Sequence, residues 1–178
     1  IVHDLDEADI ELLKDLYNGI LSSKGHVKVL LQTYFGDVRD CFKELCALPL
    51  DGIGLDFIEG KKTLELVLKN GFPQDKVLFV GIVNGKNIWR NNYQKTLELL
   101  EELKGINTVI STSCSLLHVP YTLKNETKLP EKYTKHFAFA VEKLGELAEL
   151  KELSEIDYKE SELYKYNASL FTNRPDCD

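Results

Sequence analysis

Four short apolar segments, each followed by a helix-forming segment, constrain the fold of this chain more than any other feature of its sequence. The apolar segments begin near residues 27, 53, 77 and 108, at intervals of 26, 24 and 31 residues. Strand–helix alternation at this spacing predicts a parallel sheet whose strands are joined by right-handed crossovers. The continuous apolar run at 77–80 is typical of a strand that is buried on both faces. The sequence therefore predicts an α/β fold.

Two architectures contain such repeats: an open doubly wound sheet and a (β/α)8 barrel. A complete barrel needs eight strand–helix units and about 250 residues, whereas this chain has 178 residues and four such units. The second architecture would make residues 1–178 a fragment of a single TIM-type barrel domain, a half-barrel with extra C-terminal helices. Residues 172–178 would then begin a linker to a following domain.

In the segments before and after the predicted strands, apolar residues recur at the spacing of a helix. This spacing predicts one helix over residues 6–23 and another that begins with Asp37 as its N-cap. The segment 92–104 predicts a third helix. After a polar stretch, residues 131–153 predict one long helix, and residues 158–171 predict a last one.

Composition excludes several classes of partner. The net charge of −7, from 22 Lys+Arg and 29 Asp+Glu, argues against nucleic acid or an anionic membrane, because phosphate binding needs clustered basic side chains. No apolar run reaches the ~20 residues of a membrane helix. Methionine is absent even from position 1, so we expect a processed chain or a fragment. The cysteines form no CxxC pair, so we expect free thiols in a reducing, cytoplasmic compartment; they are Cys41, Cys46, Cys114 and Cys177.

Chemistry in either architecture collects at the carboxyl ends of the strands. The candidates for a pocket there are Asp56, Asn84, Cys114 and His118. No GxGxxG or GxxxxGK[ST] motif follows a strand, which argues against dinucleotide and P-loop sites. Cys114 and His118 are compatible with a metal pair or a nucleophile with its base, but a zinc site needs three or four ligands. We interpret Cys114 as a small buried residue and His118 as a capped or hydrogen-bonded loop histidine, so we predict no metal and no catalytic residue.

Several motifs in fixed order carry a family resemblance. They are LQTYFGD at 31–37, GLDF at 54–57, VGIVNGKNIWR at 80–90 and SCSLLHVP at 113–120. In this combination the chain resembles the second half of the N-terminal domain of cobalamin-independent methionine synthases. The resemblance implies an enzyme of two (β/α)8 barrels that transfers a methyl group from 5-methyltetrahydropteroyltriglutamate to homocysteine. It also implies a zinc ion in the second barrel and a folate donor between the barrels.

The same resemblance implies that this segment has no metal. The family's zinc ligands follow a His-x-Cys, Glu, Cys pattern. When the pattern is laid on this chain, Leu31 and Thr33 stand where His and Cys are needed, Asp56 lies near the Glu, and Cys114 takes the place of the last Cys. The family's folate contacts in this domain precede Ile1, so no binding residue is carried over.

Two hypotheses follow for the chain as a whole. The first is a structural part of a methionine-biosynthesis enzyme that is inactive alone. Its partners would be the other half of its barrel and the C-terminal catalytic barrel. The isolated chain would either pair with a copy of itself or close its sheet with the helix expected at 131–153. The second is a self-standing α/β domain that binds a small ligand at its strand ends.

Overall fold

The computed structural model describes residues 4–172 of the chain. These form two compact units. Unit 1 comprises residues 1–82 and 105–114, and unit 2 comprises residues 83–104 and 115–178, within the described range. The predicted linker at 172–178 lies outside the described residues apart from Thr172.

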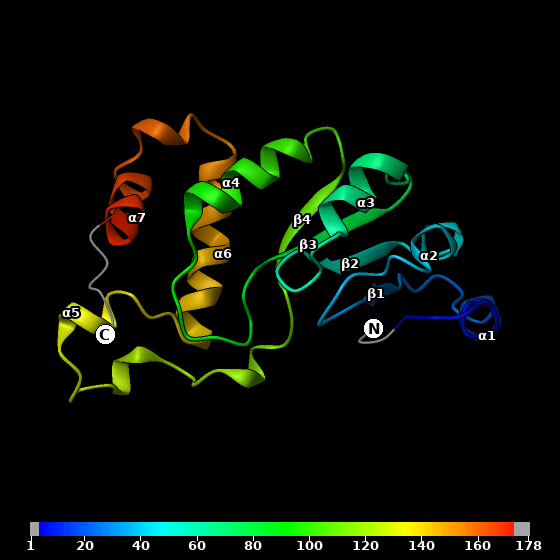
Figure 1. Cartoon of the computed structure of the whole chain (residues 1–178), viewed down its shortest axis with the longest axis horizontal. Helices are drawn as coiled ribbons and strands as arrows, with labels where there is room; N and C mark the ends of the chain where they lie inside the picture. Colours follow the sequence, from blue (N-terminus) through cyan, green and yellow to red (C-terminus); the bar gives the residue numbers. More distant parts are fainter. Residues whose placement is uncertain (1–3, 173–178) are drawn as a thin grey trace. The chain divides into compact units, whose positions relative to one another are not determined.

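Unit 1 contains a four-stranded parallel sheet with the strand order β1-β2-β3-β4 (Figure 1). Its elements are α1 (Glu7–Ser22), β1 (Leu30–Gln32), α2 (Phe42–Ala47), β2 (Gly52–Asp56), α3 (Thr63–Asn70), β3 (Val77–Val83) and β4 (Thr108–Thr112). Leu31 pairs with Ile53, which in turn pairs with Leu78. Helices separate consecutive strands, and neighbours in sequence are neighbours in the sheet, so the predicted α/β fold is confirmed.

The two faces of this sheet differ in composition. One face carries Ile53, Leu55 and Leu78, all of which are fully buried. The opposite face is rich in glycine, because side chains from neighbouring strands lie across it. A Cβ at Gly54 would collide with the side-chain amide of Gln32, its register partner on β1. Glycine in a strand often marks such a close approach.

Unit 2 is mainly helical. Its elements are α4 (Tyr93–Glu102), η1 (Leu116–His118), η2 (Leu123–Asn125), α5 (Glu131–Thr134), α6 (Ala140–Ser154), η3 (Tyr158–Glu160) and α7 (Glu162–Thr172). Helix α4 packs on both α6 and α7. Asn92 caps the N-terminus of α4, where its side chain accepts the N–H of Lys95. The predicted helix at 92–104 is therefore confirmed with its start at the cap.

The single long helix predicted for residues 131–153 is wrong. The helix stops at Thr134 and a new one begins at Ala140. Between them the backbone pairs with the segment around Trp89: His136 C=O accepts the N–H of Arg90 at 2.9 Å, and Ala138 N–H donates to Ile88 C=O at 2.7 Å. These long-range hydrogen bonds replace the helical ones, which periodicity along the chain cannot reveal.

Asp37 was also wrongly predicted as a helix N-cap. Helix α2 begins at Phe42, and its N-cap position has no side-chain hydrogen bond. Asp37 is buried instead, and both of its oxygens accept hydrogen bonds from the guanidinium of Arg39, at 2.6 and 3.1 Å. Among residues 4–172, no helix is both long and apolar enough to cross a membrane.

Candidate functional site

Asp56 ends β2 and organises two loops of unit 1. Its carboxylate accepts the backbone N–H groups of Phe35 at 3.0 Å, Ile58 at 2.8 Å and Glu59 at 2.9 Å. The side chain is 1% exposed. Three amide donors satisfy a buried carboxylate and fix the loops that carry them. In this arrangement Asp56 positions the loops after β1 and β2.

The loop after β1 holds a strained aromatic residue. Phe35 has a φ of +63°, a conformation that bulky residues rarely adopt. Tyr34 precedes it, and the two ring centroids are 6.1 Å apart. Both rings are more than one-third exposed. Strain of this kind persists only where the surroundings hold it, and the hydrogen bond from Phe35 to Asp56 is one such restraint. Nothing in the local sequence of the LQTYFGD motif indicates this strain.

The cysteines of the described range are free thiols, as expected. Cys114 is buried two residues after the end of β4. Burial raises the pKa of both Cys41 and Cys46 to about 11, so these two thiols stay protonated at neutral pH. Cys177 lies outside the described residues. Within residues 4–172, no group of three or more His, Cys, Asp or Glu side chains is arranged to hold a metal ion.

The two other predicted candidates lie in unit 2. Asn84 follows β3, and its side-chain oxygen accepts the N–H groups of Lys86 at 2.9 Å and Asn87 at 3.2 Å, which closes a tight turn. His118 is the last residue of η1 and is exposed. Each unit therefore holds two of the four predicted candidates: Asp56 and Cys114 in unit 1, and Asn84 and His118 in unit 2.

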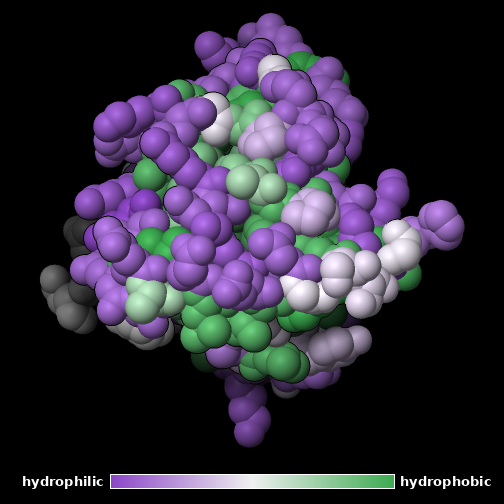
Figure 2. Space-filling model, turned by 90° about the vertical axis from the view of Figure 1, so that its right-hand side faces the viewer, coloured by the Kyte–Doolittle hydropathy of each residue, from purple (hydrophilic) through white to green (hydrophobic). Residues whose placement is uncertain are grey.

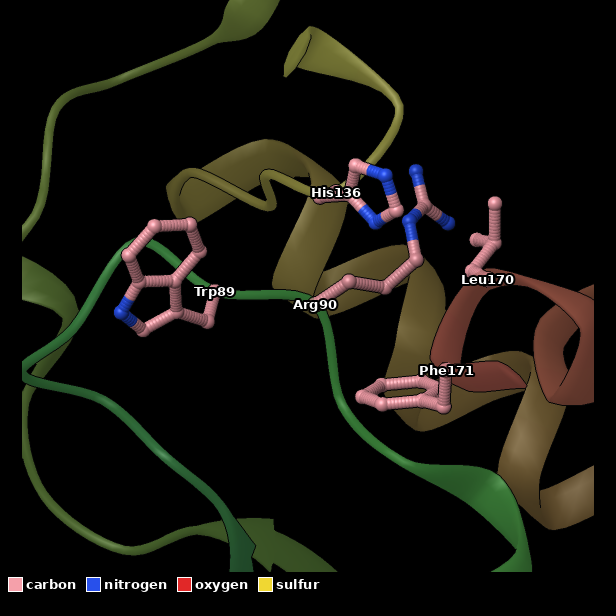
Figure 3. A pocket seen from close by; sticks show the side chains of 5 residues that line it. All are labelled: Trp89, Arg90, His136, Leu170 and Phe171. Atoms are coloured by element: carbon pink, nitrogen blue, oxygen red, sulfur yellow. The ribbon is translucent and has the colours of Figure 1, made fainter. Parts of the chain in front are cut away.

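A small hollow in unit 2 brings together residues that are not among the four predicted candidates. Its lining consists of Trp89, Arg90, His136, Leu170 and Phe171 (Figure 3). The guanidinium of Arg90 points toward the imidazole of His136, and Phe171 lies below it in this view. The hollow has a volume of about 10 Å³. Its residues are up to 82 positions apart in the sequence, so no local motif indicates it.

A buried polar network holds the backbone of this segment. Lys143 is fully buried, and its ammonium donates to Trp89 C=O at 3.0 Å. Glu146 is 1% exposed and accepts the N–H of Asn91 at 2.9 Å. Asn167 accepts the N–H of Tyr93 and donates to Asn91 C=O, both at 3.0 Å. Helices α6 and α7 thus fix residues 89–93 through polar side chains.

Burial also raises the pKa of two side chains in this network, Glu146 and Tyr93. It raises the pKa of Glu146 to about 7, although the Asn91 N–H lowers it. Burial raises the pKa of Tyr93 as well, and its hydroxyl donates to Glu149. Val141 and Leu144, two apolar residues of α6, are exposed. The buried positions include Lys143 and Glu146, because their polar ends have partners on the segment 89–93.

A parallel sheet made of successive strand–helix units, with ordered polar loops at its strand ends, defines the βα-repeat class of domains. Residues 1–108 match the family model described as cobalamin-independent synthase, N-terminal domain. The chain belongs to this family, and the resemblance seen in its motifs is confirmed.

Curated relatives agree with the family. A 5-methyltetrahydropteroyltriglutamate–homocysteine methyltransferase of Lactococcus lactis subsp. lactis is 55% identical over 175 residues, which is 97% of this chain and 23% of the relative. The proteins of the same name from Streptococcus pneumoniae and Streptococcus gordonii are 59% and 58% identical over 150 residues. Those matches cover 84% of this chain and 20% of each relative. The chain thus spans between a fifth and a quarter of the length of these relatives.

Proposed function

We propose that the polypeptide to which this chain belongs transfers a methyl group from 5-methyltetrahydropteroyltriglutamate to homocysteine, a step of methionine biosynthesis. The identity of 55–59% to methyltransferases of that name supports the proposal most strongly. The chain corresponds to at most 23% of such a relative. We therefore propose that it supplies structure and that the reacting groups lie elsewhere in the longer polypeptide, which works in the cytoplasm.

We further propose that unit 1 is part of a (β/α)8 barrel. The sequential strand order supports this, because a barrel wall is built from neighbouring parallel strands joined by helices. Helix α1 adds a second argument, since Leu12, Leu16 and Ile20 form an exposed stripe at a spacing of four residues. Hydrophobic side chains gather on the side of the molecule where α1 lies (Figure 2). The other half of the barrel is the partner that would cover this stripe.

The strand ends of this chain do not fit the zinc ion that the family implies. Leu31 offers no ligand atom, and the oxygens of Asp56 already accept three backbone N–H groups. A zinc site needs three or four nitrogen, sulfur or oxygen ligands in tetrahedral geometry. We propose that the metal and the activation of the homocysteine thiol belong to the C-terminal barrel. Asp56 and Asn84 then act here by shaping the strand-end loops.

A growth experiment tests the proposed function. A bacterial host that lacks its own methionine synthases is given either the gene of the longer polypeptide or a gene for this chain alone. We expect growth on homocysteine without methionine from the first gene and no growth from the second. Failure of the longer, well-expressed polypeptide to restore growth would contradict the methyltransferase proposal. Growth from this chain alone would contradict the assignment of a structural role.

A further inference from the structure

We propose that the hollow beside Arg90 binds a single carboxylate group of a small molecule. The inference rests on unit 2 alone and is independent of the methyl-transfer proposal. It starts from the hydrogen bonds of the Arg90 guanidinium. Its Nε donates to Lys135 C=O at 3.1 Å. The two terminal nitrogens of the fork have no hydrogen-bond acceptor, and Arg90 has no ion pair, among the described residues.

The charge of Arg90 is only partly offset by its surroundings. Glu146 is the nearby carboxyl group whose pKa Arg90 lowers, but burial holds that pKa at about 7. Glu149, the other acid of this network, accepts the hydroxyl of Tyr93. A cation thus faces the hollow in a chain whose net charge is −7. The planar guanidinium fork matches the two oxygens of a carboxylate.

The backbone around Arg90 is held in place before any ligand arrives. Arg90 N–H donates to His136 C=O, and Trp89 C=O accepts the buried ammonium of Lys143. Asn91 N–H donates to Glu146. A guanidinium on a fixed backbone loses less conformational entropy when it binds a ligand. The side chain of His136, which is 9% exposed, lines the same hollow.

The dimensions of the hollow restrict the ligand. A volume of about 10 Å³ holds about one water-sized group, whereas sites for whole drug-sized ligands measure roughly 300–1,000 Å³. One carboxylate oxygen fills a space of this size, and the second oxygen and the rest of the molecule lie outside it. Trp89 lines the hollow and is 41% exposed, and its ring packs edge-on against Phe137 at 5.4 Å. An aromatic carboxylate is therefore the ligand class that best fits the surface beside the hollow.

Trp89 is the single tryptophan of the chain, so its fluorescence reports on this hollow directly. The chain is titrated with benzoate and, in a parallel series, with benzamide, the neutral molecule of the same shape. We expect a saturable fluorescence change with benzoate and at least tenfold weaker binding of benzamide. Equal binding of the two molecules would overturn the proposal, because recognition would then not depend on the carboxylate charge.

Variants assign the binding to Arg90. We expect Arg90→Gln to weaken benzoate binding at least tenfold. Arg90→Lys keeps the charge but loses the fork, and it is expected to weaken binding several-fold. Lys104→Gln is the matched control, because it removes an exposed positive charge of unit 2 that pairs with Glu101, and it should bind as the original chain does. Unchanged binding in a folded Arg90→Lys variant, with its fold checked by circular dichroism, would overturn the proposed role of the guanidinium.

Discussion

The carboxylate of Asp56 accepts the N–H of Phe35 across 3.0 Å, and Phe35 is the one non-glycine residue of the described range with a positive φ. The last residue of β2 therefore holds a strained residue in the loop after β1. Asp56, which the sequence offers as a candidate pocket residue, holds the backbone of two loops through three hydrogen bonds. The contribution of Asp56 to the free energy of unfolding can be measured.

Replacing Asp56 by Asn should destabilise the chain by about 2 kcal/mol. The Asn side chain keeps one oxygen that can accept a hydrogen bond. Its NH₂ group takes the place of the second oxygen and faces a backbone N–H, so a hydrogen bond is lost there. The remaining hydrogen bonds are weaker too, because a charged acceptor forms stronger hydrogen bonds than a neutral one. Urea unfolding measures the loss. Asp75→Asn is the control, because Asp75 is an exposed carboxylate that pairs with Lys76. An equal effect of the two variants would contradict the loop-organising role of Asp56.

Two glycine substitutions should have opposite effects. A Cβ at Gly60 would collide with the backbone carbonyl of Asp56 and the hydroxyl of Thr63, so Gly60→Ala should destabilise by about 1–3 kcal/mol. Gly145 lies inside α6 with open space around it, so Gly145→Ala should stabilise by about 1 kcal/mol through helix propensity. Thermal unfolding of both variants compares the signs. A stabilising Gly60→Ala would contradict the described packing after β2.

The stability of the chain should fall as the pH rises toward neutrality, because burial raises the pKa of Glu146 from 4.5 to about 7. A carboxyl group with a higher pKa in the folded state binds a proton on folding between these values. The stabilisation is complete below pH 4.5 and is lost as the pH rises through 7. We expect this group to cost about 3 kcal/mol at about pH 8.

Urea unfolding at several pH values checks this dependence. Glu146→Gln should remove it, whereas Glu155→Gln, at an exposed ion pair of α6, should leave it in place. A flat profile in the original chain would contradict the raised pKa of Glu146, and an unchanged slope in Glu146→Gln would assign the pH dependence to another group.

The apolar stripe of α1 gives a test of the barrel proposal. Leu16 is 57% exposed and Leu21 is 4% exposed. We expect Leu16→Glu to change the stability of the isolated chain by less than about 0.5 kcal/mol and Leu21→Glu to destabilise it by about 3 kcal/mol or more. In the longer polypeptide both variants should be destabilising, because the proposed barrel would cover Leu16 there. A longer polypeptide that tolerates Leu16→Glu would contradict that packing.

The isolated chain should associate with itself. The outer strands of the sheet, β1 and β4, each have one neighbour, and unpaired strand edges favour association. Light scattering after size exclusion at micromolar concentration is expected to show a dimer. A monomer at all concentrations would mean that these edges are covered within the chain.

Local patterns predicted the strands well and the long-range polar contacts poorly. The apolar runs that begin near 53 and 77 became β2 and β3 within a residue, because buried parallel strands leave a continuous signal. The strand near 27 shortened to Leu30–Gln32. Residues 135–139 are not helical, although the pattern predicted a helix there, because their backbone forms hydrogen bonds with Arg90 and Ile88, about fifty positions away in the sequence. Periodicity carries no information about such partners.

In the candidate site, too, local features could be predicted from the sequence and long-range contacts could not. Asp56 and Asn84 were recognisable as strand-end polar residues, and both lie where the sequence placed them. Arg90 and His136 were not linked, since the contact between their backbones joins segments 46 positions apart. Nor could the burial of Lys143 be foreseen, because a lysine is normally exposed unless a specific acceptor compensates its ammonium, and that acceptor is the carbonyl of Trp89.

Methyl transfer in vitro is the direct test of the activity proposed for the longer polypeptide. The purified longer polypeptide and the purified chain are each given homocysteine and 5-methyltetrahydropteroyltriglutamate that is isotopically labelled in its methyl group. Labelled methionine should form with the longer polypeptide and should stay at the background level with the chain alone. Absence of labelled methionine from the folded longer polypeptide, or turnover by the chain alone, would contradict the account.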